Sequence, residues 1–214
     1  FVGYNQGKLD IVNCRSNATI YSTVNGDGTH GGFVGNHHSD ELTIEGCVFT
    51  GKLLTTATNS TAYCGGFVGW CNTATTIKNC LYAPAIIDTE HGETEVQAGT
   101  GDYTSCTFGR KSTATVTITN SYYTRTLGTG QGKAARTITA GEYVTIEAVS
   151  PVGSLVEDGT YTVSGITAYA NGITRGDAFY YGNGDEVSLT LNHAEPPAGY
   201  TFTGYSASAG TLDG

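Results

Sequence analysis

Six cysteines have the broadest chemistry of any residues in this chain, because a thiol can bind metal, form a disulfide or act as a nucleophile. No two of them have Cys-x-x-Cys spacing, which argues against a zinc ribbon or a dithiol redox motif. Three of them, Cys14, Cys47 and Cys80, recur at an interval of 33 residues. Recurrence at one repeat position favours a row of free, buried thiols over a disulfide framework.

The remaining three cysteines lie outside this row. Cys64 and Cys71 flank one Gly-Gly-Phe-Val-Gly segment, and Cys106 follows later in the chain. A disulfide across that segment is an alternative, but the strict geometry of a disulfide makes free thiols the favoured interpretation.

Two further segments gather metal-binding side chains. His37-His38-Ser39-Asp40-Glu41 holds four possible ligands in five residues, and an acidic run extends from Asp88 to Glu95. Adjacent side chains alternate in direction along an extended chain, so they rarely point at one centre. We expect a solvated loop and a solvated insertion at these places, with no metal and no cofactor.

Catalytic patterns are missing from the sequence. Neither Gly-x-Ser-x-Gly nor His-Glu-x-x-His occurs, and the basic residues of the repeat region share no repeat position. Thr-x-Thr triplets also fail to recur at one position, so no flat threonine array of the ice-binding type is expected. We predict that this chain is not an enzyme.

The elements that would position these residues follow from three repeated stretches. Each begins with all or part of Gly-Gly-Phe-Val-Gly and runs to Ile-x-x-Cys. A fixed period of this size predicts stacked coils. A sequence rich in Thr and other β-branched residues, with few helix formers, predicts strands. We expect a parallel β-helix of about four coils, in which equivalent residues form inward ladders: Ile11, Ile44, Ile77 and Ile118 form one, and Cys14, Cys47 and Cys80 another.

Each ladder cysteine follows a residue suited to a tight turn. Asn13 and Asn79 precede the first and third ladder cysteines, Asn120 holds the same place in the fourth stretch, and Gly46 takes it in the second. In a turn, these amides could bond to the backbone or to each other in a stack, and Gly46 is consistent with a turn and not with a binding role.

A change in the sequence pattern divides the chain into two parts. The repeats occupy residues 1–125, a Gly-rich junction covers 126–135, and no cysteine follows Cys106. Residues 136–214 alternate short β-rich runs with turn pairs and predict a small, truncated antiparallel β module. The fold class is therefore all-β.

Composition excludes several partners. Of the 214 residues, 19 are acidic and 10 are Lys or Arg, giving a formal net charge of −9. Without a basic cluster, nucleic acid and anionic membranes are poor partners, and no apolar run is long enough to insert into a bilayer. Because Phe1 begins inside a repeat motif, we expect the chain to be a piece of a longer protein.

The Gly-Gly-Phe-Val-Gly…Ile-x-Asn-Cys repeat resembles the GLUG-type repeats of large bacterial surface proteins, over roughly residues 1–125. The tail, with Gly199-Tyr200-Thr201-Phe202-Thr203-Gly204-Tyr205, is similar to internalin-type B-repeats, which usually have Trp where Tyr205 stands. These resemblances imply an extracellular or cell-surface location in a bacterium. Neither family implies a catalytic residue.

The functional expectation is a non-enzymatic, adhesin-like stalk or display scaffold, which could bind a host glycan or surface protein through its variable loops. Trp70, Tyr82 and Tyr103 could stack on sugar rings, although a packing role for each stays open. The alternative function is an accessory, non-catalytic part of a larger secreted peptidase or carbohydrate-active enzyme.

Overall fold

The computed structural model describes residues 1–23, 26–56, 62–96, 104–111, 113–139, 144–151, 159–162, 165–169, 172–175, 178–185, 189–192 and 200–207. Every regular element within these ranges is a β-strand. The chain divides into two compact units, Phe1–Ala135 and Arg136–Gly214. The all-β prediction is confirmed.

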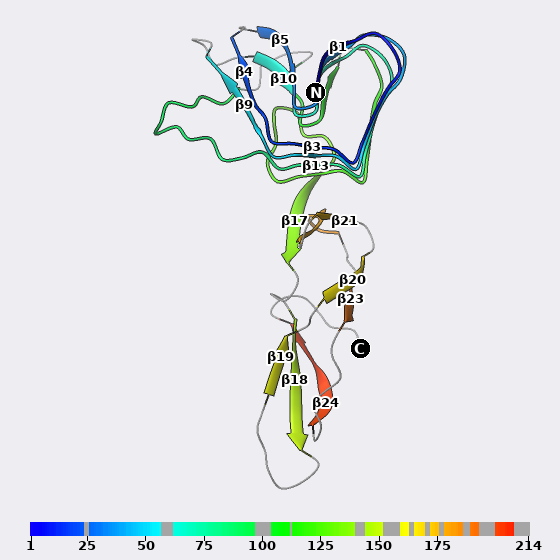
Figure 1. The fold of residues 1–214 in the computed structure, drawn as a ribbon, viewed down its shortest axis with the longest axis vertical. Coiled ribbons are helices and arrows are strands. Elements are labelled where there is room, and N and C mark those ends of the chain that lie inside the picture. Colours follow the sequence, from blue (N-terminus) through cyan, green and yellow to red (C-terminus); the bar gives the residue numbers. More distant parts are fainter. Residues whose placement is uncertain are drawn as a thin grey trace. The chain divides into compact units, whose positions relative to one another are not determined.

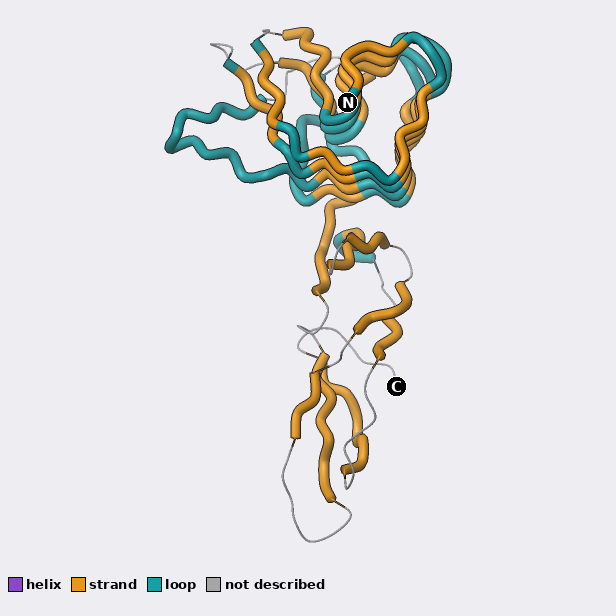
Figure 2. Tube along the Cα trace, in the orientation of Figure 1, coloured by secondary structure: helices purple, strands orange, loops and turns teal. Residues whose placement is uncertain are grey.

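The first unit is a stack of four coils (Figures 1 and 2). Coil 1 (residues 1–31) contains β1 (Val2–Asn5), β2 (Leu9–Val12), β3 (Arg15–Ser16), β4 (Thr19–Ser22) and β5 (Gly26–Gly31). Coil 2 (32–65) contains β6 (Val34–His37), β7 (Leu42–Glu45), β8 (Val48–Phe49), β9 (Lys52–Thr55) and β10 (Ala62–Gly65). Coil 3 (66–106) contains β11 (Val68–Cys71), β12 (Thr75–Lys78) and β13 (Leu81–Tyr82), and coil 4 (107–132) contains β14 (Gly109–Lys111), β15 (Val116–Thr119) and β16 (Tyr122–Tyr123).

Corresponding strands of successive coils pair in parallel. The sheet orders β1-β6-β11-β14 and β2-β7-β12-β15 each follow the coil order. Ile11, Ile44, Ile77 and Ile118 occupy one register position, and the second and third of these are fully buried. The predicted parallel β-helix is therefore the observed fold of this unit, with its apolar core enclosed by the coils.

A left-handed backbone residue marks the same corner in every coil. Asn13, Gly46, Asn79 and Asn120 have φ values of 53°, 65°, 53° and 43°. Asn tolerates this conformation and Gly adopts it at no steric cost, which explains why only these two residue types occur there. The Asn120 side chain also donates a hydrogen bond to Asn79 Oδ1 at 2.8 Å, so the corner residues of coils 3 and 4 are joined.

A second corner is built by the Gly-Gly-Phe-Val segment. The backbone N–H groups of Phe67 and Val68 both donate to the carbonyl of Phe108 in the next coil, at 2.8 and 2.9 Å. The rings of Phe33, Phe67 and Phe108 pack in a row at tilted angles, with centroids 4.9 and 5.0 Å apart. A Cβ at Gly66 would lie against the Thr107 carbonyl oxygen, so glycine permits the close approach of coils.

At the corresponding corner of coil 4, a side-chain amide takes the place of a Phe carbonyl. Gln131 Oε1 accepts hydrogen bonds from Phe108 N at 3.0 Å and Gly109 N at 2.8 Å, and Gln131 Nε2 donates to Gly109 O at 3.0 Å. In the coils before it, a Phe carbonyl accepts the equivalent pair of N–H bonds. Gln131 therefore substitutes for the Phe of a fifth coil, while Thr107 N donates to the Thr129 carbonyl at 3.0 Å.

The second unit is antiparallel, as predicted. β17 (Lys133–Thr139) spans the division between the units, and β21 (Gly172–Arg175) forms a hairpin with β22 (Ala178–Gly182) around the buried Phe179. β18 (Val144–Pro151) pairs with β19 (Gly159–Thr162) and β24 (Tyr200–Ala207), and β20 (Gly165–Tyr169) pairs with β23 (Leu189–Asn192).

Three threonines lie at one register position. Thr43, Thr76 and Thr117 hold this position on β7, β12 and β15, and Asp10 holds it on β2. The next row outward holds Glu45 and Lys78, which form an ion pair at 3.0 Å.

Replacing Gln131 with Ala should destabilise the first unit. The variant leaves two backbone N–H groups, one of them on the buried Gly109, without their acceptor, and each such loss costs about 1–3 kcal/mol. Urea unfolding followed by circular dichroism measures the change. The control is Gln6→Ala, since the side chain of Gln6 is exposed and donates to the Tyr4 hydroxyl; this variant should stay within about 0.5 kcal/mol of the parent. Equal stability of the two variants would contradict the capping role.

The left-handed corner predicts different outcomes for two substitutions at Asn79. Both Asn79→Gly and Asn79→Ala remove the bond to Asn120, but only Ala places a Cβ on a backbone with positive φ. The Ala variant should be less stable than the Gly variant by about 1–2 kcal/mol in denaturant unfolding. An Ala variant as stable as the Gly variant would show that this corner is not left-handed.

Candidate functional site

The cysteine ladder is made of hydrogen-bonded neighbours. Cys14 N donates to Cys47 Sγ at 3.3 Å, Cys47 N donates to Cys80 Sγ at 3.4 Å, and Cys80 N donates to Ser121 Oγ at 3.1 Å. The sulfur thus accepts a backbone bond from the preceding coil, and serine takes over this role in coil 4. The cysteine row therefore joins neighbouring coils, and its sulfurs do not form a cluster that is open to a ligand.

All six cysteines are free, so no bridge joins Cys64 and Cys71. Burial raises the pKa of both thiols to about 12. Cys64 N also donates to Ser105 Oγ at 3.0 Å, which repeats the sulfur-to-serine exchange of the first ladder. Thiols held protonated in this way are poor nucleophiles and poor metal ligands.

His37 corrects the expectation of a wholly solvated loop at residues 37–41. Its ring is fully buried, with Nδ1 3.1 Å from Asn5 Nδ2 and Nε2 3.2 Å from the Asp40 carbonyl. His38, Asp40 and Glu41 are exposed. Because His37 is the last residue of β6 and is in register with Cys71, its side chain belongs to the core.

The three aromatic residues predicted as sugar contacts have different positions. Tyr82 is only 1% exposed and stacks on Phe49, so it is a core residue and the sugar-contact prediction is wrong for it. Trp70 is half-buried, with the Arg110 guanidinium 4.4 Å from its ring centroid and its N–H bonded to Asn72 Oδ1 at 2.7 Å. These packing contacts occupy much of Trp70. Tyr103 lies outside the described residues.

A long loop after β13 breaks the regularity of the stack (Figure 2). Cys80 and Ser121 are 41 residues apart, against 33 for the earlier ladder pairs. The outgoing limb follows coil 2 through Ala83 and Ala85, whose N–H groups donate to Phe49 and Gly51. The returning limb pairs antiparallel with β9 through Glu95, where the regular stack would place a parallel strand.

Two ion pairs hold this loop against the stack. Lys52 Nζ lies 2.6 Å from Glu93 Oε2, and Arg125 Nη2 lies 2.7 Å from Glu95 Oε1. The hydrogen bond from Lys52 lowers the pKa of Glu93, whereas burial raises the pKa of Glu95 against the opposing effect of Arg125. Both carboxylates therefore face cations from other coils, an arrangement that fixes the loop in place.

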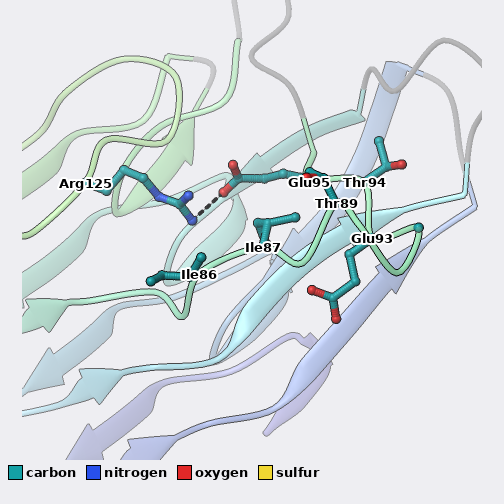
Figure 3. Close-up of a pocket in the computed structure, with 8 residues that line it drawn as sticks. Ile86, Ile87, Thr89, Glu93, Thr94, Glu95 and Arg125 are labelled. Carbon is teal, nitrogen blue, oxygen red and sulfur yellow. Dashed lines mark hydrogen bonds and ion pairs between the residues drawn. The ribbon is translucent and has the colours of Figure 1, made fainter.

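The loop and Arg125 of coil 4 line an open hollow of ≈ 530 Å³ (Figure 3). Its lining combines apolar, hydroxyl, carboxylate and guanidinium groups: Ile86, Ile87, Thr89, Gly92, Glu93, Thr94, Glu95 and Arg125. The volume is within the range of small-ligand sites. We refer to it as the loop hollow, and it is the candidate binding site.

Comparisons of this chain with protein-family models, with curated proteins and with solved structures found no match. Within the described ranges, no group of His, Cys, Asp and Glu side chains has the arrangement of a metal site. The same ranges hold no helix that is long and apolar enough to cross a membrane.

Sequence reasoning identified the segment 88–95 but not the residues that fix it. Lys52 and Arg125 lie 41 and 30 residues from their carboxylate partners, and no motif links them. The only available signal was the insertion itself, which lengthens the third repeat.

Thiol titration tests the cysteine assignments. The denatured chain should react with six equivalents of a disulfide reagent, and the native chain with the half-exposed Cys14 alone. Fewer than six equivalents would reveal a disulfide.

The raised thiol pKa values also predict an alkaline limit to stability. Above pH 9.0, the ordinary value for cysteine, the unfolded chain loses protons that the folded chain keeps on Cys64 and Cys71 up to about 12. The free energy of unfolding should therefore fall as the pH rises from 9.0 towards 12. Replacing both residues with Ser should flatten this part of the profile, whereas an unchanged slope would contradict the assignment.

Proposed function

We propose that this chain is a non-enzymatic, extracellular segment of a bacterial surface protein, in which the β-solenoid is a scaffold and the loop hollow binds a glycan or protein ligand. The observation that carries the proposal is the loop hollow itself. It is an irregular feature on a stack whose coils pair in register through the sheets β1-β6-β11-β14 and β2-β7-β12-β15.

The scaffold part of the proposal is supported by how each coil is used. Ladder positions are filled by the same few residue types in successive coils, and their backbone bonds go to neighbouring coils. In repeat proteins of this kind, variation between repeats falls in loops, where binding residues commonly lie.

The binding part is supported by the chemistry of the hollow. A guanidinium and carboxylates beside threonine hydroxyls can exchange hydrogen bonds with a polyhydroxylated ligand, while Ile86 and Ile87 offer apolar contact. A peptide with mixed polar and apolar side chains would use the same groups.

The resemblance to GLUG-type repeats and to internalin-type B-repeats points to the same class of protein and to the bacterial cell surface. The alternative is an accessory part of a larger secreted peptidase or carbohydrate-active enzyme. Both share the scaffold, and they differ in whether this chain has a ligand of its own.

A binding screen tests the proposal. The labelled chain is applied to a glycan array and to a panel of extracellular host proteins, and at least one specific ligand is expected. Arg125→Ala should weaken binding of that ligand at least tenfold, because the substitution removes the guanidinium from the hollow and releases Glu95.

The matched control is Arg15→Ala, which removes an exposed arginine from coil 1 and should leave binding unchanged. Equal binding by both variants would place the ligand elsewhere. A panel without any ligand would favour the accessory alternative, and turnover of a polysaccharide by this chain would contradict the proposal.

A further inference from the structure

The two carboxylates of the loop hollow are held with different strength. Lys52 Nζ contacts both oxygens of Glu93, at 2.8 and 2.6 Å, and Asp88 N donates to Glu93 Oε2 at 2.7 Å. The hydrogen bond from Lys52 is the main reason that the pKa of Glu93 is lowered. Glu93 is therefore a firmly held, ionised group that anchors the loop to β9.

Glu95 lies in surroundings that favour its ionised form less. Arg125 Nη2 is 2.7 Å from its Oε1, yet burial raises the pKa of this carboxyl against the effect of the guanidinium. Its charge also reaches Tyr82 on β13 and Cys64 on β10, two buried groups whose pKa values burial raises and the Glu95 charge raises further. A carboxylate that is partly desolvated beside neutral groups is one that another anion can replace at Arg125.

Arg125 is placed to receive such an anion. Its side chain is 40% exposed and lines the hollow, against 26% exposure for Glu95. Figure 3 shows its guanidinium at the hollow beside Ile86 and directed toward Glu95, and Nη2 also donates to the Ala85 carbonyl at 3.4 Å. The planar fork of a guanidinium matches a carboxylate in a bidentate pair.

The loop backbone offers little to a peptide. Strand addition, a common mode of peptide binding, depends on free main-chain groups. Many loop amides already donate hydrogen bonds within the protein: Ala83, Ala85, Asp88, His91, Gly92, Glu93 and Val96. Recognition therefore falls to side chains.

The side chains of the hollow suit a small ring that carries a carboxylate. Ile86 and Ile87 offer apolar contact to the C–H groups of a sugar, and the hydroxyls of Thr89 and Thr94 can exchange hydrogen bonds with sugar hydroxyls. A volume of ≈ 530 Å³ is within the range of small-ligand sites. Together with the guanidinium, these groups favour a sugar acid over an acidic peptide.

We propose that the loop hollow binds an acidic sugar residue, whose carboxylate replaces that of Glu95 on the Arg125 guanidinium. This inference rests on the proposed function, because it names the ligand class of the same hollow. Once the ligand holds Arg125, Glu95 loses its cation and faces a second negative charge. Its pKa then rises and it takes up a proton from solvent, so binding is tighter at lower pH.

A nuclear magnetic resonance titration that follows the Arg125 Nε–Hε signal tests the proposal. The probes are trigalacturonate and sialyllactose, which carry a carboxylate on two different sugar rings, with their neutral methyl esters for comparison. At least one acid should bind, more tightly than its ester and with an affinity that rises from about pH 7 to about pH 5. Glu95→Gln should bind that acid at least fivefold more tightly at neutral pH and should lose the pH dependence, because Gln imitates the protonated side chain.

Glu41→Gln is the matched control, since it removes the same charge from an exposed position outside the hollow and should bind like the parent. Circular dichroism verifies that both variants are folded, and the pH profile of the parent is a test that needs no variant. An ester that binds as tightly as its acid, a Glu95→Gln variant that binds no more tightly than the parent, or tighter binding of an acetylated tri-aspartate peptide would overturn the inference.

The titration also separates this inference from the proposed function. If neither acid binds but the glycan array or the protein panel yields a neutral ligand that Arg125→Ala weakens, the acidic-sugar assignment is wrong and the binding function stands. A panel without any ligand would contradict both.

Discussion

Vertical register is the constraint on which this structure depends: each position of a coil must meet the same position of the next. Parallel pairing brings Ile44 against Ile77, and the N–H bonds of the corners pass from one coil to the following one. A one-residue slip would move every inward side chain to the outer face, so the ladders and the backbone bonds enforce one another. The interior is consequently uniform, and variation is confined to loops and ends.

The structure after coil 4 follows from that constraint. A coil without a successor needs other groups for its corner N–H bonds, and Gln131 supplies an amide oxygen in that place. The fourth stretch departs from the repeat at this place, where Cys106 pairs with Thr129 and Thr107 N donates to the Thr129 carbonyl.

Much of the solenoid could be predicted from the sequence because the same few residue types recur at each repeat position. The Ile ladder and the Asn or Gly corner needed only the repeat spacing. His37 was misjudged because a run of polar letters resembles a solvated loop, whereas strand β6 turns its last side chain into the core. The loop hollow could not be predicted from the sequence. Lys52 and Arg125 pair with Glu93 and Glu95 because the fold brings them together, and no local sequence pattern links them.

Nuclear Overhauser effects between isoleucine methyl groups measure the register most directly. With selectively methyl-labelled protein, cross-peaks should join Ile11 to Ile44, Ile44 to Ile77 and Ile77 to Ile118, with none between Ile11 and Ile77 because coil 2 separates them. Absence of the three nearest-neighbour cross-peaks, or a strong cross-peak that skips a coil, would contradict the stacked arrangement described above.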